Sequence, residues 1–198
     1  MNSSYHLTPG NVQEEMQCIA SDLMNNWILR IGETEYRLTE IEFYYDQKGT
    51  HMDPYIHGHK LQSEYGRWYF HGSGLDITIG RPGYSASILI RAIFNTKTEE
   101  YIYGPLNVVS AILDSFGTFS LHNIAVGLIE VPENTFKTEK PIAARRVGLN
   151  KDKDPDKWAA LYRFLIMPKN KHADKTGIEE VMRLSDQYTS DDIKGIWG

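Results

Sequence analysis

The first regular spacing of apolar side chains lies in residues 11–27, NVQEEMQCIASDLMNNW. These side chains recur at steps of three and four, which places them on one stripe of a helix. Two acidic residues, Glu14 and Glu15, fall in the first turn, where they suit the helix dipole. The pattern predicts a helix whose buried stripe consists of Val12, Met16, Ile19, Leu23 and Trp27.

After residue 27 the pattern changes to short runs rich in β-branched and aromatic residues, separated by breaks that contain glycine. The first two runs lie close enough together to form a hairpin. Helical spacing returns later in the chain, with a proline near one helix start. The predicted strands are 27–31, 35–45, 66–70, 75–80, 87–94, 126–131, 142–147 and 162–167, and the further predicted helices are 104–117, 155–161 and 177–184.

This order of elements indicates an α+β fold, in which a curved, mostly antiparallel sheet of roll or barrel shape is flanked by a few helices. The length of 198 residues suits one domain, and no repeat, low-complexity tract or linker divides it. We therefore expect a single domain over residues 1–198, with residues 1–10 and 185–198 loosely held.

The composition disfavours some partners and favours one kind of compartment. No apolar run is long enough to span a bilayer, so we expect no membrane partner. The N-terminus lacks the basic flank and apolar core of a secretory signal. Because Cys18 is the only cysteine, no intramolecular disulfide can form, and a cytoplasmic or other reducing intracellular location is expected.

The charge balance bears on nucleic acid as a partner. A net charge of −5 and a pI near 5.8 disfavour a protein whose main task is to grip phosphates, since such proteins are usually basic. The short basic segment KNKHADK, residues 169–175, is predicted to be a solvated loop rather than a nucleic-acid patch. No phosphate-binding or dinucleotide fingerprint occurs, and we expect no cofactor.

Residues 36–45, YRLTEIEFYY, carry two glutamates two positions apart among apolar and aromatic residues. Since strand side chains alternate, Glu40, Glu42 and Tyr44 share one face. One interpretation is a polar face in water, which the residues alone favour. The other is a carboxylate in a pocket beside an aromatic wall, where desolvation would raise its pKa and suit it to act as a general base.

The segment THMDPYIHGHK holds three histidines, His51, His57 and His59, beside Asp53. The spacing His-x-His can bring two imidazoles to one metal ion. No HExxH motif, cysteine pair or second cluster accompanies it, so we expect polar loop histidines, one of which could contact a substrate, and no metal site.

Two charged residues interrupt strands that are otherwise apolar: Arg91 in SILIRAIF and Asp76 in LDITIG. A guanidinium in such a strand needs a carboxylate partner, and Glu40, Glu42 and Asp76 are the candidates. A structural ion pair and a functional role are both open, although buried charges gather at functional sites.

Six segments follow one another in a recognisable order: YRLTEIEFYY, DPYIHGH, GRWYFHGSGLDITIG, SILIRAIF, YGPLNVVSAIL, and ARRVGL with the later W and YRFLI. Together they resemble the alkyladenine (3-methyladenine) DNA glycosylase family, whose first and fourth motifs run roughly R-I/L-V-E-T-E-A-Y and V-L-I/L-R-A-I/L-E. The mixed α+β fold of that family agrees with the fold predicted from periodicity.

The resemblance implies an enzyme of base excision repair that flips a damaged purine out of DNA and hydrolyses its N-glycosidic bond. Such a reaction passes through an oxocarbenium-like state. Carried over by position, Glu42 would be the general base, Arg91 would help to hold the attacking water, and Glu40 would be structural support. Tyr44 would stack on the base, with His57 on the other side of the pocket.

Two positions depart from the family pattern. His71 stands where the family places a tyrosine wedge in the minor groove, and histidine is smaller and less apolar. Asp76 stands where an asparagine meets the base edge, and its carboxylate would disfavour acceptors on a purine. The pocket therefore matches the family better than the DNA-gripping surface does.

Three functions remain open from the sequence. A DNA N-glycosylase acting on damaged or modified purines ranks first, because the four central pocket positions match in order. A relative that binds or hydrolyses a free nucleoside or nucleobase-like molecule without gripping duplex DNA is favoured by the two departures and the acidic charge. In a non-catalytic descendant, the same residues would persist only as a buried network.

Overall fold

The computed structural model describes residues 5–116, 125–133, 135–185 and 187–197. Its helices are α1 (Val12–Asn26), α2 (Pro105–Phe116), α3 (Pro155–Ala159), α4 (Lys175–Leu184) and α5 (Ser190–Trp197), with one 3₁₀ helix, η1 (Lys60–Ser63). Its strands are β1 (Trp27–Ile31), β2 (Thr34–Asp46), β3 (Tyr65–His71), β4 (Gly74–Ile79), β5 (Ser85–Asn95), β6 (Tyr101–Tyr103), β7 (Val126–Glu130), β8 (Ile142–Ala144) and β9 (Arg163–Leu165).

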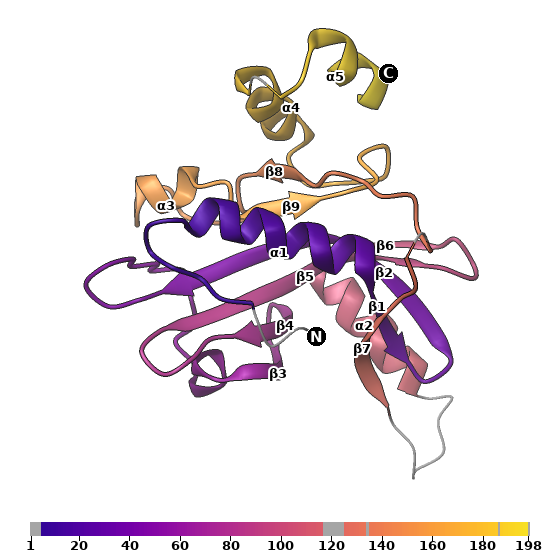
Figure 1. Ribbon diagram of the computed structural model, residues 1–198, viewed down its shortest axis with the longest axis horizontal. Helices are drawn as coiled ribbons and strands as arrows, with labels where there is room; N and C mark the ends of the chain where they lie inside the picture. The colour runs from indigo at the N-terminus through magenta and orange to yellow at the C-terminus, as the bar shows by residue number, and fades with distance from the viewer. Residues whose placement is uncertain (1–4, 117–124, 134, 186, 198) are drawn as a thin grey trace.

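The strands form one antiparallel sheet that curls into a half-barrel, so the predicted single α+β domain is confirmed (Figure 1). Its main path runs β3-β4-β5-β2-β1-β7, while β6 pairs with β5 and β9 joins β2 to β8. The long strand β2 lies at the centre, because it pairs with β1, β5 and β9. Residues far apart in the chain can therefore meet on either of its faces.

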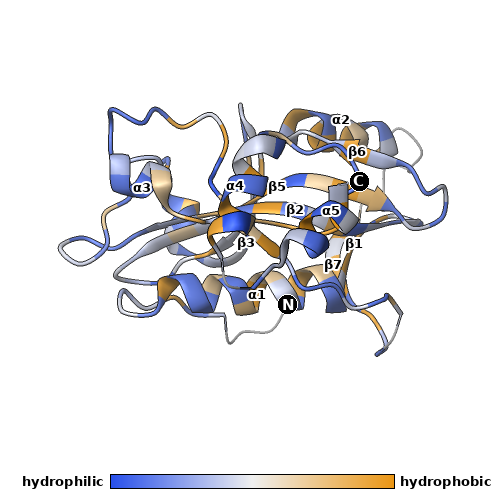
Figure 2. Ribbon diagram, turned by 90° about the horizontal axis from the view of Figure 1, so that it is seen from above, coloured by the Kyte–Doolittle hydropathy of each residue, from blue (hydrophilic) through white to orange (hydrophobic). Residues whose placement is uncertain are grey.

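The two faces of β2 differ in chemistry. Ile41, Phe43 and Tyr45 point into the main apolar core, to which α1 contributes its predicted stripe. α1 and α2 lie on opposite sides of the sheet (Figure 2). The alternate side chains, including Glu40 and Glu42, point to the face that α2 covers only in part, and this face carries the candidate site.

Most predicted elements are confirmed, with two kinds of difference. β6, η1 and α5 were not expected, and the predicted strand 142–147 ends at Ala144. Residues 145–147 leave the sheet because the Arg146 side chain forms an ion pair with Asp53 and the Val147 N–H donates a hydrogen bond to Glu42. Residue 117 of the predicted helix 104–117 lies outside the described residues.

Some residues near the two chain ends pack against the rest of the fold. Tyr5 and Leu7 are buried in the main core. Ile193 of α5 packs with α4 in a smaller cluster above β8 and β9, as the position of these helices in Figure 1 indicates. Residues 1–4, 186 and 198 of these ends lie outside the described residues. None of the described helices has the length and apolar character needed to cross a membrane.

A glycine at the end of β4 allows η1 to approach the sheet. A Cβ on Gly80 would overlap the carbonyl oxygen of Gln62 and lie 2.7 Å from its carbonyl carbon. This close approach lets the buried Gln62 side chain donate a hydrogen bond of 2.9 Å to Ser87 on β5. Gly80 thus fixes one wall of the region in which the site is found.

Replacing Gly80 by alanine is therefore expected to lower the free energy of unfolding by at least about 3 kcal/mol, because backbone on both sides of the contact must move. Gly127 is the matched control, since a Cβ there meets nothing within 4 Å. Urea unfolding of both variants measures the difference. Equal stability of Gly80→Ala and Gly127→Ala would contradict this account of the contact.

Candidate functional site

The register of the sheet places the predicted polar residues in one row. Glu42 on β2 is opposite Leu89 on β5, and Leu89 is opposite Asp76 on β4. On its other side Glu42 is opposite Arg163 on β9. Directly opposed residues of antiparallel strands point to the same face, so this row crosses four strands. The two carboxylates of the row stand on either side of Leu89.

Glu42 is completely buried and is held by three neighbours. The Val147 N–H donates to its Oε1 at 2.7 Å, and the Tyr44 hydroxyl donates to its Oε2 at 3.0 Å. The Arg91 guanidinium lies 3.4 Å from Oε1. Burial raises the pKa of Glu42, while the charge of Arg91 and the hydrogen bond from Val147 oppose that rise without cancelling it.

Glu40 is equally buried but has more cationic neighbours. Arg91 Nε lies 2.9 Å and Arg163 3.5 Å from its Oε1, and His172 Nδ1 lies 2.6 Å from its Oε2. Burial alone would raise the pKa of Glu40, but the hydrogen bond from His172 and the charge of Arg163 outweigh it and hold the pKa below the usual value. The interpretation of this strand face as solvated is therefore wrong, because neither glutamate is exposed.

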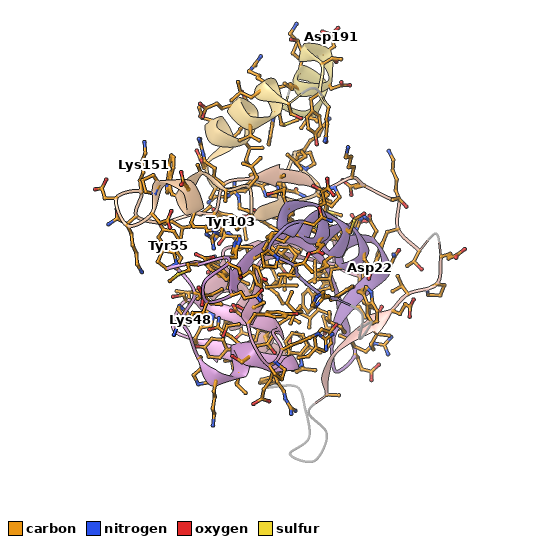
Figure 3. The ribbon with its side chains drawn as sticks, turned by 60° about the vertical axis from the view of Figure 1, so that its left-hand side comes forward. Asp22, Lys48, Tyr55, Tyr103, Lys151 and Asp191 are labelled. Atoms are coloured by element: carbon orange, nitrogen blue, oxygen red, sulfur yellow. The ribbon has the colours of Figure 1, made fainter. Side chains whose placement is uncertain are left out.

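A pocket with a volume of about 400 Å³ lies next to the contacts of Glu42, although the buried Glu42 does not itself line it. The three neighbours of Glu42, namely Tyr44, Arg91 and Val147, all line it. The segment around Tyr55 and the segment that precedes α3 meet at its side, where the Tyr55 hydroxyl donates to the carbonyl oxygens of Asn150 and Asp154 (Figure 3). The remaining lining residues include His57, Gln62, His71, Asp76, Leu89, Pro105 and Lys153.

The wall opposite Glu42 is a chain of hydrogen bonds. Ser73 N–H donates to His71 Nδ1 at 3.2 Å, which leaves Nε2–H to donate to Asp76 at 2.9 Å. Ser87 donates to the second oxygen of Asp76 at 2.7 Å and itself accepts from Gln62. The ring of His57 lies edge-on to His71, with 4.5 Å between ring centres. Burial lowers the pKa of His57.

This arrangement differs from the role predicted for His71. A side chain that enters the minor groove has to project from the surface, whereas the His71 side chain is only 9% exposed and points at Asp76. Phe70 is an exposed large apolar side chain at this hairpin. The turn that follows His71 is also short, since β4 begins at Gly74.

Arg146 and Asp53 form a fully buried ion pair beside the pocket, with 2.6 Å between Nη1 and Oδ2. The guanidinium also lies over the rings of Tyr44, Tyr55 and Tyr162, at 4.8, 5.4 and 5.3 Å from their centres. Two of these rings line the pocket. The ion pair therefore fixes the aromatic wall from behind.

All the predicted site residues meet around one pocket: Glu42 lies beneath it, and Tyr44, His57, His71, Asp76 and Arg91 line it. Arg91 pairs with both glutamates, while Asp76 pairs with His71 instead. Within the described ranges no group of three or more His, Cys, Asp or Glu side chains could hold a metal ion.

The other two histidines of the 51–59 segment lie apart from this wall. His51 is buried against Tyr162 with Lys157 Nζ 3.0 Å from Nε2, and burial lowers its pKa to about 4. His59 caps η1 and stacks on Tyr69.

Sequence reasoning missed four residues that shape the site. Arg163 lies in an apolar strand and carried the same signal as Arg91, so it could have been found. Tyr55, Arg146 and His172 lie in loops without periodicity, and no local pattern identifies them.

Asp53→Asn should lower the free energy of unfolding by about 3–5 kcal/mol, because it leaves the buried Arg146 charge without a partner. The matched control is Glu35→Gln, which breaks the exposed Arg30–Glu35 pair and should cost no more than about 1 kcal/mol. Thermal and urea unfolding of both variants measure the contrast. A loss of stability in Asp53→Asn as small as in the control would refute the proposed support of the pocket wall.

Comparison with known proteins gives one informative relative. No family model matches the sequence. Uncharacterized protein L759 of Acanthamoeba polyphaga mimivirus is 30% identical over 199 aligned positions, which cover 82% of this chain and 91% of that protein. Identity at this level across most of both chains indicates common descent. The chain therefore belongs to the same family as uncharacterized protein L759 of mimivirus.

Proposed function

We propose that the protein hydrolyses the N-glycosidic bond of a damaged or modified purine in DNA, with Glu42 as the general base. One observation carries the proposal: a buried carboxylate with a raised pKa is in contact with three groups, the Tyr44 hydroxyl, the Arg91 guanidinium and the Val147 N–H, whose residues all line one pocket. Perturbed carboxylates at the base of a cleft are typical of acid–base sites. The motif resemblance to alkyladenine DNA glycosylases supports the same reaction.

The pocket has suitable walls for a flipped base. Its volume of about 400 Å³ is in the range of small-molecule sites, and Tyr44, Tyr55 and His57 provide rings against which a flat base can pack. The His71–Asp76 wall would meet the edge of the base. Asp76 accepts hydrogen bonds from His71 and Ser87, so it would favour a base that presents N–H donors.

The reaction follows from the position of Glu42. A water bound on the pocket side of Glu42 and Arg91 would transfer a proton to the Glu42 carboxylate while its oxygen forms a bond to the sugar C1′. The C1′–N bond breaks, and its electron pair leaves with the base. The negative charge of Glu42 would stabilise the cationic sugar during this step. Arg91 would orient the water and, because it also pairs with Glu40, would itself be held in place.

A second function is favoured by the position of His71. Because this side chain lies inside the pocket wall, the described residues place no wedge at the family's position, and the net charge is −5. The same catalytic arrangement could act on a free nucleoside, which needs no wedge and no grip on a duplex. The reaction and the role of Glu42 are the same in both cases, and only the substrate differs.

Glu42→Gln is expected to reduce base release by about 100-fold or more, since it removes the general base. The fold should survive, because the glutamine amide can keep the hydrogen bond from Val147 and Arg91 keeps its pair with Glu40. The assay measures release from duplex oligonucleotides carrying hypoxanthine, ethenoadenine or methylated purines, and from the corresponding free nucleosides.

The exposed Glu100→Gln is the matched control and should behave as wild type. Release at the wild-type rate by Glu42→Gln would remove Glu42 from the mechanism. Release from nucleosides alone, without the steep salt dependence of duplex binding, would select the free substrate. No release from any substrate by the folded wild-type protein would leave the network as a purely structural feature.

The pH dependence of the reaction tests the same assignment. A general base has to be ionised, so kcat/KM should fall as pH is lowered through the pKa of Glu42. Because burial raises that pKa above the usual 4.5, the acid limb should lie above pH 4.5. Circular dichroism over the same pH range excludes unfolding as the cause. An acid limb below pH 4.5 would point to a different, solvent-exposed carboxylate.

A further inference from the structure

The basic segment 169–175 is mostly a loop with exposed lysines, as predicted, and it also forms one side of a second hollow. This hollow has a volume of about 360 Å³, and the end of α5 closes it. None of its eight described lining residues is acidic; they are Pro168, Lys169, Asn170, Lys171, His172, Lys175, Ile196 and Trp197. In a chain with a net charge of −5, three lysines around one concave surface are a local excess of positive charge.

Two of these lysines contact aromatic rings rather than carboxylates. Lys175 Nζ lies 4.8 Å from the centre of the Trp197 ring, and Lys171 Nζ lies 5.5 Å from the centre of the Tyr103 ring. Among the described residues, no carboxylate oxygen lies within 4.0 Å of Lys169, Lys171 or Lys175. The aromatic rings therefore hold the Lys171 and Lys175 side chains in place without neutralising their positive charge.

An unsatisfied donor accompanies this charge. The indole nitrogen of Trp197 is buried and has no hydrogen-bond partner within the described parts of the chain. A buried indole N–H normally finds an acceptor, and an orphan of this kind often marks a missing ligand or water. The N-terminus of α4, which begins at Lys175, does not contribute to this site, because the Asp174 carboxylate already caps it by accepting from the Gly177 N–H.

The second hollow is connected to the candidate pocket through β6 and Glu40. Tyr103, beneath Lys171, is followed after one residue by Pro105, which lines the candidate pocket. His172 lines the second hollow and contacts Glu40, whose partner Arg91 lines the candidate pocket.

We propose that the hollow formed by Lys169, Lys171, Lys175 and Trp197 binds a phosphate group. Three exposed ammonium groups supply donors for the oxygens of a phosphate and can adjust their positions to it. That the phosphate belongs to the strand carrying the target base rests on the proposed function. Lysines interleaved with aromatic rings are typical of surfaces that bind single-stranded nucleic acid.

The test compares two triple variants of equal charge. Lys169→Gln, Lys171→Gln and Lys175→Gln together remove the hollow's charge, while Lys48→Gln, Lys60→Gln and Lys97→Gln remove three exposed lysines elsewhere. Binding is measured for inorganic phosphate by NMR and for a fluorescent single-stranded oligonucleotide by anisotropy across salt. These measurements require no turnover, so they can succeed or fail independently of base release.

The first triple should weaken oligonucleotide binding by at least about 10-fold and flatten the dependence of log K on log salt by about 2, at roughly 0.7 per lost contact. The control triple variant should change the oligonucleotide affinity and its salt dependence much less. Equal effects of the two triples, or no binding of either ligand by the wild-type protein, would overturn the site. Binding of inorganic phosphate without the oligonucleotide would confirm the anion site and refute the strand as its source.

Discussion

The structure depends on one electrostatic constraint: Glu40 and Glu42 are both removed from water on the same face of β2. Burying an ionised carboxylate without compensation costs several kcal/mol, and two such charges on neighbouring positions also repel each other. The protein must therefore surround them with donors and positive charge. Arg91, Arg163, His172, Tyr44 and the Val147 N–H are those groups.

These compensating groups come from distant parts of the chain, which explains the topology around β2. β5 and β9 flank this strand and bring Arg91 and Arg163 alongside it. The chain after β8 leaves the sheet so that the Val147 N–H reaches Glu42. The same departure carries Arg146 to Asp53, behind the rings that line the pocket. The need to satisfy Glu42 thus also shapes the pocket above it.

The fold was predictable where periodicity is strong, as in α1 and β2, because burial of one face imposes a repeat on the sequence. The alternation of β2 also predicted which side chains share the face of Glu42, and the isolated charge of Arg91 predicted a carboxylate partner. Local patterns carry no information about Arg146 meeting Asp53 from 93 positions away. β6 and α5 were missed because β6 is three residues long and α5 lies in a polar segment.

The burial of His71 was not predictable for a related reason. The position of a residue in a motif can predict the backbone of a hairpin, but it does not predict which neighbouring group the side chain contacts. His71 turns inward because Asp76 is buried and, among the described residues, its only other side-chain donor is the Ser87 hydroxyl. The acidic side chain of Asp76 therefore explains the inward position of His71.

The pKa values of the two glutamates also shift in opposite directions, although only one residue lies between them. Glu40 faces two guanidinium groups and His172, so its pKa is held low and it remains ionised as part of the framework. Glu42 shares Arg91 with Glu40 and otherwise has neutral donors, so burial prevails and its pKa is raised. When two carboxylates differ in this way, the one with the raised pKa is suited to exchange protons and the other to hold charge in place. Glu42 is also the one whose three partners line the pocket, so electrostatics and geometry select the same residue.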